Sequence, residues 1–358
     1  MVRRVLPIVA ALGLVVLAAA PASARNINAQ NTYAVQNLVS DNGAPGSIHD
    51  GNLVNGWGIV AGPTTPWWVA DNGTDKSTLY TGAGAIVPIV VNVDGGPTGI
   101  VFNGISTDFV ITSNGVSGAA RFIWSTEGGQ ILGWNPNVPG SPVPSDQSFL
   151  GTTVPGAIYK GLAIATKDGK QYLYAANFHD ARVDVFDSSF RLQNWAGAFV
   201  DPRIPDGYAP FGIQTLNGMV FVTYAKQDAD AEDEIAGKGL GFVDAFGVDG
   251  SFLGRVASRH ALNAPWGLAW APADFGKFSG DLLVGNFGDG TIHAFAWTKN
   301  GWKSQGTLRD TSHHKIVIDG LWGIGFGNGS ASGPVNVLYF AAGPDDESHG
   351  LFGSITGP

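Results

Sequence analysis

Short apolar runs alternate with small and polar residues along most of the chain, and one arrangement of these runs occurs six times. In each copy a residue, usually aromatic, precedes a glycine and an apolar run, and a second apolar run follows and ends in small or amide residues. The marker glycines are Gly58, Gly99, Gly161, Gly212, Gly267 and Gly323. They are about 40 to 60 residues apart, the spacing at which a four-stranded propeller blade repeats. The pattern therefore predicts six blades.

The composition of the apolar runs favours strands over helices. The runs are rich in Val, Ile, Phe, Tyr and Trp and are interrupted every few residues by Gly, Asn, Asp or Pro, as expected for buried strands joined by turns. The chain has 52 glycines among 358 residues and only 14% charged residues, which fits hairpin turns and sheets that are covered on both faces. We therefore predict an all-β protein, a six-bladed β-propeller.

The N-terminal segment has the features of a signal peptide. Arg3 and Arg4 precede an apolar stretch, residues 5–20, and residues 22–24 are small, as a signal-peptidase site requires. The stretch is shorter than a membrane-spanning helix and contains Pro7. We expect residues 1–24 to be removed, which leaves one domain, residues 25–358, that is secreted or extracytoplasmic and has no membrane anchor.

Alternating residues near the start of this domain predict how the ring closes. The segment Tyr33 to Val39 comes before the first blade, and we expect it to supply the outer strand of the last blade, which removes open sheet edges. The chain has no cysteine, so closure of the ring takes the place of disulfides.

Acidic residues outnumber basic ones, 29 to 20, which argues against a nucleic-acid partner and favours a cation. We expect a monomer.

Two insertions interrupt the repeat. Residues 135–155 are rich in Pro, Gly, Ser and Thr and are predicted to leave the second blade as a surface excursion. Residues 226–238 carry five acidic side chains, and the first interpretation of this run is a solvated acidic loop. These side chains are Asp228, Asp230, Glu232, Asp233 and Glu234.

Large side chains recur where the inner strands begin. Four of the six positions before the marker glycines are aromatic, and a fifth is Lys160; the aromatic ones are Trp57, Phe211, Trp266 and Trp322. One interpretation places these rings as wedges between adjacent blades, where they bury the most surface. The other places them at the mouth of the axial channel, where with Lys160 they would hold a sugar or an aromatic ligand. The repetition does not separate the two interpretations.

Amide and carboxylate side chains recur at the ends of the second strands. Asn72, Asn177 and Asn286 occupy the same blade position, and Glu127 takes the equivalent place in the second blade. Oxygen donors of this kind are the ligands of Ca²⁺ and similar divalent cations, so the four residues are candidate metal ligands. The alternative is local, because Asn and Asp after a strand also cap turns through their own backbone.

Few residues offer other catalytic chemistry. His179 and His349 lie on the same predicted face and are candidate general bases near neutral pH. The chain has no thiol nucleophile, and it contains neither G-x-S-x-G nor H-E-x-x-H.

Several stretches, among them NLVNGWGIV, WWVADNG, APWGLA and DGLWGIGFGNG, resemble an uncharacterised family of exported bacterial propeller proteins. Some members of that family carry a PEP-CTERM sorting tail, which this chain lacks, and this favours free secretion. More distantly, the blade pattern is similar to NHL-type repeats and to the six-bladed gluconolactonase, paraoxonase and strictosidine-synthase-like group. The resemblance to that group implies a divalent cation near the axis, held here by Glu127, Asn177 and Asn72.

Two functions follow from these features. The first is a divalent-cation-dependent hydrolase of lactone or ester type that acts on a small or aromatic substrate. The second is a non-catalytic propeller that binds a glycan or a protein through its aromatic residues. A third, a quinone-dependent oxidoreductase, would need a basic cradle for the cofactor, and the sequence offers none. Fold alone does not choose among them.

Overall fold

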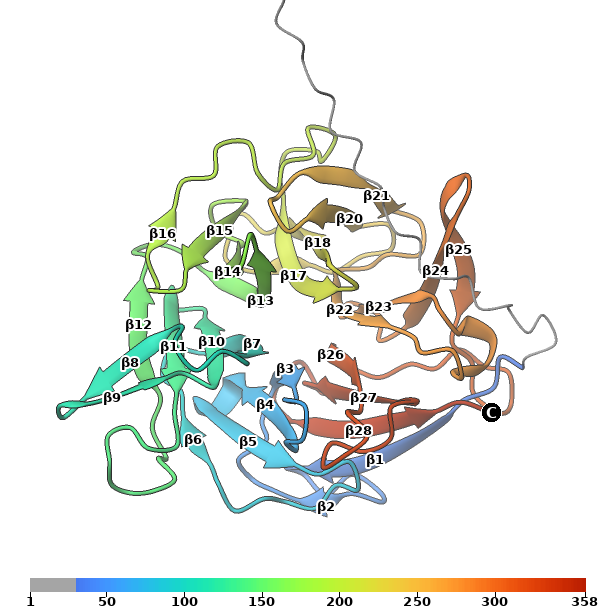
Figure 1. Ribbon diagram of the computed structural model, residues 1–358. Helices are drawn as coiled ribbons and strands as arrows, with labels where there is room; N and C mark the ends of the chain where they lie inside the picture. Colours follow the sequence, from blue (N-terminus) through green and yellow to red (C-terminus); the bar gives the residue numbers. More distant parts are fainter. Residues whose placement is uncertain (1–29) are drawn as a thin grey trace, which may run out of the picture.

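The computed structural model describes residues 30–358, and these form six sheets arranged as a ring around a central axis (Figure 1). The predicted signal peptide, residues 1–24, lies outside the described residues. Within the described part the helices are two short 3₁₀ turns, Asn72–Thr74 and Gly276–Phe278. None of its helices is long and apolar enough to cross a membrane. The predicted all-β, six-bladed propeller is confirmed.

Each blade is an antiparallel sheet whose first strand lies nearest the axis. The first blade consists of β3 (Gly56–Val60), β4 (Trp67–Asp71), β5 (Lys76–Tyr80) and β6 (Val91–Asn92). The second consists of β7 (Pro97–Phe102), β10 (Phe122–Thr126), β11 (Gln130–Trp134) and β12 (Phe149–Thr153). The third consists of β13 (Tyr159–Lys167), β14 (Lys170–Asn177), β15 (Arg182–Asp187) and β16 (Leu192–Gln193).

The remaining blades follow the same order. The fourth consists of β17 (Tyr208–Leu216), β18 (Met219–Gln227), β20 (Phe242–Gly247) and β21 (Phe252–Ser258), and β19 (Glu234–Ile235) adds to β18. The fifth consists of β22 (Pro265–Trp270), β23 (Leu282–Asn286), β24 (Ile292–Thr298) and β25 (Gly301–Thr307). The sixth consists of β26 (Leu321–Phe326), β27 (Val337–Ala342), β28 (Leu351–Thr356) and the N-terminal β1 (Ala34–Ser40), to which β2 (Ile48–His49) adds in parallel.

The marker glycines are required because the inner strands converge. A Cβ atom on Gly99 would lie 2.1 Å from the backbone nitrogen of Leu162 in the next blade, far closer than real Cβ contacts. The other five would lie 2.1 to 2.8 Å from a backbone oxygen of the next blade, and Gly323 of the sixth blade meets Trp57 of the first. Glycine is the residue that permits such close approach of two backbones. The repeat in the sequence is therefore the contact that closes the ring.

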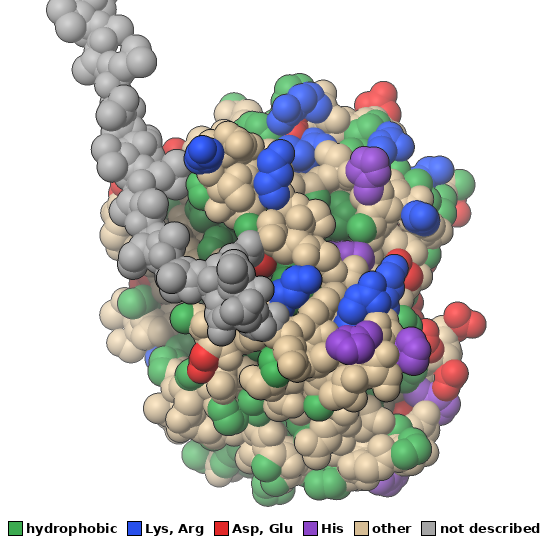
Figure 2. All heavy atoms as spheres, turned by 90° about the vertical axis from the view of Figure 1, so that its right-hand side faces the viewer, with side chains coloured by type: hydrophobic (Ala, Val, Ile, Leu, Met, Phe, Trp, Pro, Cys, Tyr) green, Lys and Arg blue, Asp and Glu red, His purple; other side chains and the backbone are tan. Residues whose placement is uncertain are grey.

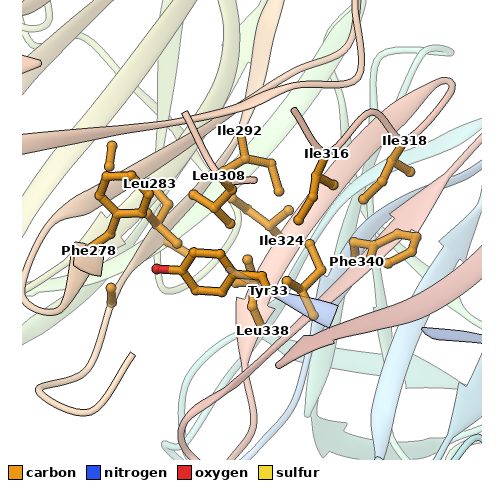
Figure 3. Packing of buried hydrophobic residues seen from close by; sticks show 14 of the residues in the cluster. Tyr33, Phe278, Leu283, Ile292, Leu308, Ile316, Ile318, Ile324, Leu338 and Phe340 are labelled. Atoms are coloured by element: carbon orange, nitrogen blue, oxygen red, sulfur yellow. The ribbon is translucent and has the colours of Figure 1, made fainter. Parts of the chain in front are cut away.

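The hydrophobic core lies between neighbouring blades. Figure 3 shows one such cluster, in which Leu283 and Ile292 of the fifth blade face Ile324 and Phe340 of the sixth. Tyr33, which precedes β1, inserts its ring into this cluster, is 1% exposed, and donates a hydrogen bond to the carbonyl oxygen of Phe275 at 3.0 Å. The N-terminal segment therefore fastens the fifth and sixth blades together.

The predicted closure by the N-terminal strand is confirmed. β1 pairs antiparallel with β28, with Ala34 opposite Thr356 and Ser40 opposite Leu351, and so forms the outer strand of the sixth blade.

On the side of the ring shown in Figure 2, basic, acidic and histidine side chains are interspersed with polar and apolar ones.

The predicted excursion from the second blade is shorter than expected. Only residues 135–148 leave the sheet, because Phe149–Thr153 returns to pair with β11 as the outer strand β12. A hairpin that the sequence analysis did not predict, β8 (Val110–Ser113) and β9 (Val116–Ala119), lies between the first two strands of this blade.

Candidate functional site

A buried lysine lies at the face of the ring where the inner strands begin. Lys160, near the start of β13, has a side chain that is 1% exposed. Its ammonium nitrogen lies 2.5 Å from Glu127 Oε1 and 2.8 Å from Asp233 Oδ1. It also lies over the rings of Trp57 and Phe178, 5.4 and 6.0 Å from their centroids. One ammonium group therefore joins residues from the first, second, third and fourth blades.

The surrounding charges keep Lys160 protonated. Burial by itself lowers the pKa of a lysine, because the charged form loses its hydration. Here the negative charges and hydrogen bonds of Glu127 and Asp233 outweigh burial, and the pKa of Lys160 is raised above its usual value. The side chain therefore acts as a fixed cation and not as a base.

Hydrogen bonds extend this arrangement across the face. The amide nitrogen of Asn72 donates to Glu127 Oε2 at 2.8 Å, and Asn72 Oδ1 accepts from the amide of Asn55 at 3.2 Å. The same amide of Asn55 donates to Glu347 Oε2 at 2.5 Å. Asn55, Asn72, Glu127, Lys160, Asp233, Glu234 and Glu347 are called here the Lys160 network.

Two carboxyl groups of the Lys160 network have raised pKa values. Burial raises the pKa of Glu234 to about 8, because the favourable charge of Lys160 does not compensate for lost hydration and Glu347 adds a negative charge. Burial also raises the pKa of Glu347, against the hydrogen bond from Asn55 and the charge of Lys160. Perturbed carboxyls around one cation are typical of sites that transfer protons.

The predicted aromatic residues meet one another beneath this network. Trp57 and Trp322 stack with centroids 3.5 Å apart, and the ring of Trp266 meets both of them edge-on. Phe211 packs against Trp322 at 5.7 Å, and all four rings are at most 9% exposed. These residues come from the first, fourth, fifth and sixth blades, so their contacts extend beyond those between two adjacent blades. They form a plug across the axis, and their faces are turned toward one another and not toward solvent.

The plug also positions the polar groups above it. The indole nitrogen of Trp266 donates to the backbone carbonyl of Lys160 at 2.7 Å. That of Trp322 donates to Asn55 Oδ1 at 3.1 Å. Two of the aromatic residues predicted to contact a ligand therefore support the Lys160 network from below.

The four candidate metal ligands are only partly brought together. Asn72 and Glu127 are in contact, but the amide of Asn177 donates to Asp180 and Asp184 of its own blade, at 3.0 and 2.9 Å. The amide of Asn286 likewise donates to the carbonyl oxygen of Ala261 and to Asp289, at 2.8 and 3.1 Å. These two side chains make the local turn contacts that were the alternative interpretation.

The donor set does not fit a divalent cation. Both oxygens of Glu127 already have partners, the ammonium of Lys160 and the amide nitrogen of Asn72. Within residues 30–358 no group of three or more His, Asp or Glu side chains is arranged to hold a metal ion. The ammonium of Lys160 takes the place beside Glu127 that a cation was expected to take.

The side chains of the two candidate histidines make their hydrogen bonds to groups other than Lys160. His179 is exposed in the turn after β14, with Nδ1 3.2 Å from the carbonyl oxygen of Ala231. His349 pairs through Nδ1 with Asp41 Oδ2 at 2.9 Å, and this hydrogen bond raises its pKa. Because Asp41 directly follows β1, His349 contributes to ring closure.

Four members of the Lys160 network were not singled out as site residues from the sequence. Asn55 lies just before β3, and Glu347 follows Asp345 and Asp346 in the turn after β27. Asp233 and Glu234 lie in the acidic run that was interpreted as a solvated loop. Asp230, Glu232 and Asp233 of that run are exposed, as a solvated loop predicts, but Glu234 lies in β19, which pairs with β18. Asp233 contacts Lys160 although its side chain is 72% exposed.

The chain has relatives that match it over most of its length. It is 32% identical over 340 residues to "Uncharacterized protein R648" of Acanthamoeba polyphaga mimivirus, a match that covers 91% of this chain and 81% of the relative. It is 33% identical over 343 residues to "Uncharacterized protein L690" of the same virus, covering 90% and 86%. No model of a known protein family matches. These relatives are viral, whereas the resemblance in the sequence implied a bacterial family.

Solved structures share the fold at low identity. A protein of unknown function from Bacteroides thetaiotaomicron has a TM-score of 0.56 at 9% identity, covering 90% of this chain and 76% of that one. A streptogramin B lyase has a TM-score of 0.51 at 13% identity, covering 91% and 97%. A glucose dehydrogenase has a TM-score of 0.50 at 10% identity, covering 89% and 98%. At these identities the likeness concerns the architecture alone.

Proposed function

The chain belongs to the same family as the mimivirus proteins R648 and L690, and we propose that it is a hydrolase of small lactones or esters whose active site is the Lys160 network. Because both relatives are uncharacterised, the proposal rests on this chain's own residues. The observation that carries it is the buried ammonium of Lys160, held between Glu127 and Asp233 beside Glu234 and Glu347.

Lys160 would supply the positive charge for the reacting carbonyl. Its partner Asp233 is on an inserted loop and is 72% exposed, so a substrate carbonyl oxygen can replace it at the ammonium. Glu127 and the rings of Trp57 and Phe178 hold the ammonium in place. A fixed donor that faces the carbonyl oxygen stabilises the negative charge that develops there in the transition state.

The two carboxyls with raised pKa values would move the protons. Glu347, oriented by Asn55, takes a proton from water as the water oxygen bonds to the carbonyl carbon. Glu234, which is mostly protonated at pH 7 because its pKa is about 8, gives its proton to the leaving oxygen as the carbon–oxygen bond breaks. An ester gives a carboxylic acid and an alcohol, a lactone gives one hydroxy acid, and exchange with water restores both glutamates.

The experiment is an activity screen with a matched lysine pair. The wild-type protein is assayed on p-nitrophenyl acetate and δ-valerolactone beside Lys160→Met and Lys167→Met. Lys167 lies on the same strand but pairs with Asp168 at the surface. We expect turnover by the wild type and by Lys167→Met, and a loss of at least about 100-fold in Lys160→Met, the range for one lost oxyanion donor.

The alternative is a propeller that binds without turnover. Saturable binding of δ-valerolactone with no product formed would replace the enzyme proposal with this alternative. A glycan-binding platform built on Trp57, Trp266 and Trp322 receives no support from their burial, because a sugar needs an accessible ring face. Export remains part of the proposal, and its test is the N-terminal sequence of the protein recovered outside the cytoplasm, expected to begin at Arg25.

A further inference from the structure

We propose that the protein has a second ligand site at the opposite end of the axis, which binds a neutral small molecule with an apolar body and one hydrogen-bonding group. A cavity of about 400 Å³ lies where the inner strands end. This volume is within the range of pockets that hold small organic ligands. The site is distinct from the Lys160 network, which lies where the inner strands begin.

The walls of the cavity are apolar and belong to several blades. They are formed by Val60 of β3, Ile100 and Phe102 of β7, and Ala163 and Ile164 of β13. Val60, Phe102 and Ile164 each pack on one side against a buried core cluster between blades and are partly exposed on the other. Because the rigid core holds these side chains, the cavity is formed before any ligand arrives.

The polar groups in the cavity are few and uncharged. Asn328 is already engaged, since its amide donates to the carbonyl oxygens of Gly62 and Thr65 at 2.7 and 2.9 Å. Gln214 lines the floor, and beside it the hydroxyl of Thr215 is buried with no hydrogen-bond partner among the described residues. None of the described side chains that line the cavity is charged. A charged ligand would lose hydration without gaining a counter-charge, so a neutral ligand is favoured.

A substrate-sized molecule cannot pass along the axis from one end to the other. Between them lies a cavity of about 20 Å³, lined by the marker glycines Gly58, Gly99 and Gly323 and closed toward Lys160 by Trp266. Such a volume holds about one water molecule. Gln214 lines both cavities, so this residue lies where the larger cavity meets the smaller one. A ligand there would place its polar group at Gln214 and its apolar body against the walls.

The experiment uses 1-naphthol and naphthalene as probes, which share an apolar body and differ by one hydroxyl. Binding is followed by the methyl NMR signals of Ile100 and Ile164 in the cavity, with buried Ile355 of the sixth blade as a reference. Both probes should shift the two cavity signals saturably and leave Ile355 unchanged. Gln214→Leu should weaken the binding of 1-naphthol by about fivefold, the effect of one hydrogen bond, and should leave the binding of naphthalene unaffected.

Three control variants test whether the probes bind in this cavity. Gln36→Leu, on the exposed outer strand β1, should change neither affinity, and Ile164→Trp, which fills the cavity, should abolish both. Lys160→Met should bind both probes normally, so failure of the proposed hydrolase leaves this result untouched. The proposal is overturned if Ile100 and Ile164 show no saturable shift, if Ile355 shifts equally, or if Gln214→Leu weakens both probes alike.

Discussion

The ammonium of Lys160 in the third blade and the carboxylate of Glu127 in the second lie 2.5 Å apart at the face where the inner strands begin. Asp233, from the fourth blade, takes a second position on the same ammonium at 2.8 Å. A buried lysine with two carboxylate partners can be retained for stability, for function or for both. Substitution of its partners separates these roles.

Glu127→Gln should destabilise the fold. The substitution keeps the shape of the side chain but leaves the buried ammonium of Lys160 with the exposed carboxylate of Asp233 alone. Loss of one partner from a fully buried ion pair costs about 3 to 5 kcal/mol, and Glu127 is one-third exposed, so we expect about 1 to 3 kcal/mol. Urea denaturation measures this change. Asp168→Asn, which breaks the surface pair with Lys167, is the control and should change the free energy of unfolding little.

Stability should fall as the pH rises from about 5 to 8. Burial raises the pKa of Glu234 from 4.5 to about 8, so the folded state holds a proton that the unfolded state releases within this range. Its contribution is fully present below the unfolded pKa and is lost as pH rises through the folded pKa. Melting temperatures measured at intervals from pH 5 to 8.5 should decline less steeply in Glu234→Gln. Parallel curves for the two proteins would mean that Glu234 titrates normally.

Trp322→Ala should be among the most destabilising substitutions of an aromatic residue. Its ring is fully buried and packs against Trp57, Phe211 and Phe287 in the plug. Removal of a large buried ring typically costs about 3 to 5 kcal/mol. Trp297, which is 59% exposed, provides the control, and its replacement by Ala should cost less than about 1 kcal/mol. If chemical denaturation shows that Trp322→Ala and Trp297→Ala lower the free energy of unfolding equally, the packed plug is contradicted.

Deletion of residues 33–40 should disrupt the ring. It removes β1, exposes the edge of β28 and takes the Tyr33 ring out of the cluster between the fifth and sixth blades. We expect aggregation or a large loss of thermal stability, because an open edge strand pairs with other chains. Tyr33→Phe should fold normally and lose about 1 kcal/mol with its hydrogen bond to Phe275. A deletion variant that stays monomeric and melts like the parent would refute closure by β1.

Much of the fold could be predicted because its main contact leaves a signature in the sequence. The inner strands approach so closely that only glycine fits at the marker positions, and this requirement recurs once per blade. The closing strand was also visible as an alternating segment with no blade of its own. The hairpin of β8 and β9 was missed, although Asn114 and Gly115 form its turn with positive φ angles, as Asn-Gly commonly does.

The site was less predictable because it depends on contacts between blades. Lys160 and Glu127 were singled out from their blade positions, but nothing in the sequence pairs them. Asn177 looked equivalent to Asn72, yet its neighbour Asp184 satisfies it locally, whereas the neighbour of Asn72 across the face is Glu127. The acidic run was interpreted from its charge alone, and the pairing of β19 with β18, which fixes Glu234 beside Asp233 and its contact with Lys160, is not visible in the sequence.

In the proposed hydrolase the ammonium of Lys160, and not a divalent cation, provides the positive charge of the site. The measurement that separates the two is the rate at which EDTA-treated wild-type protein hydrolyses δ-valerolactone before and after Ca²⁺ is added. We expect the same rate in both conditions, because both oxygens of Glu127 are already engaged by Lys160 and Asn72. Hydrolysis that begins only when Ca²⁺ is added, or that occurs in neither condition, would contradict the proposal.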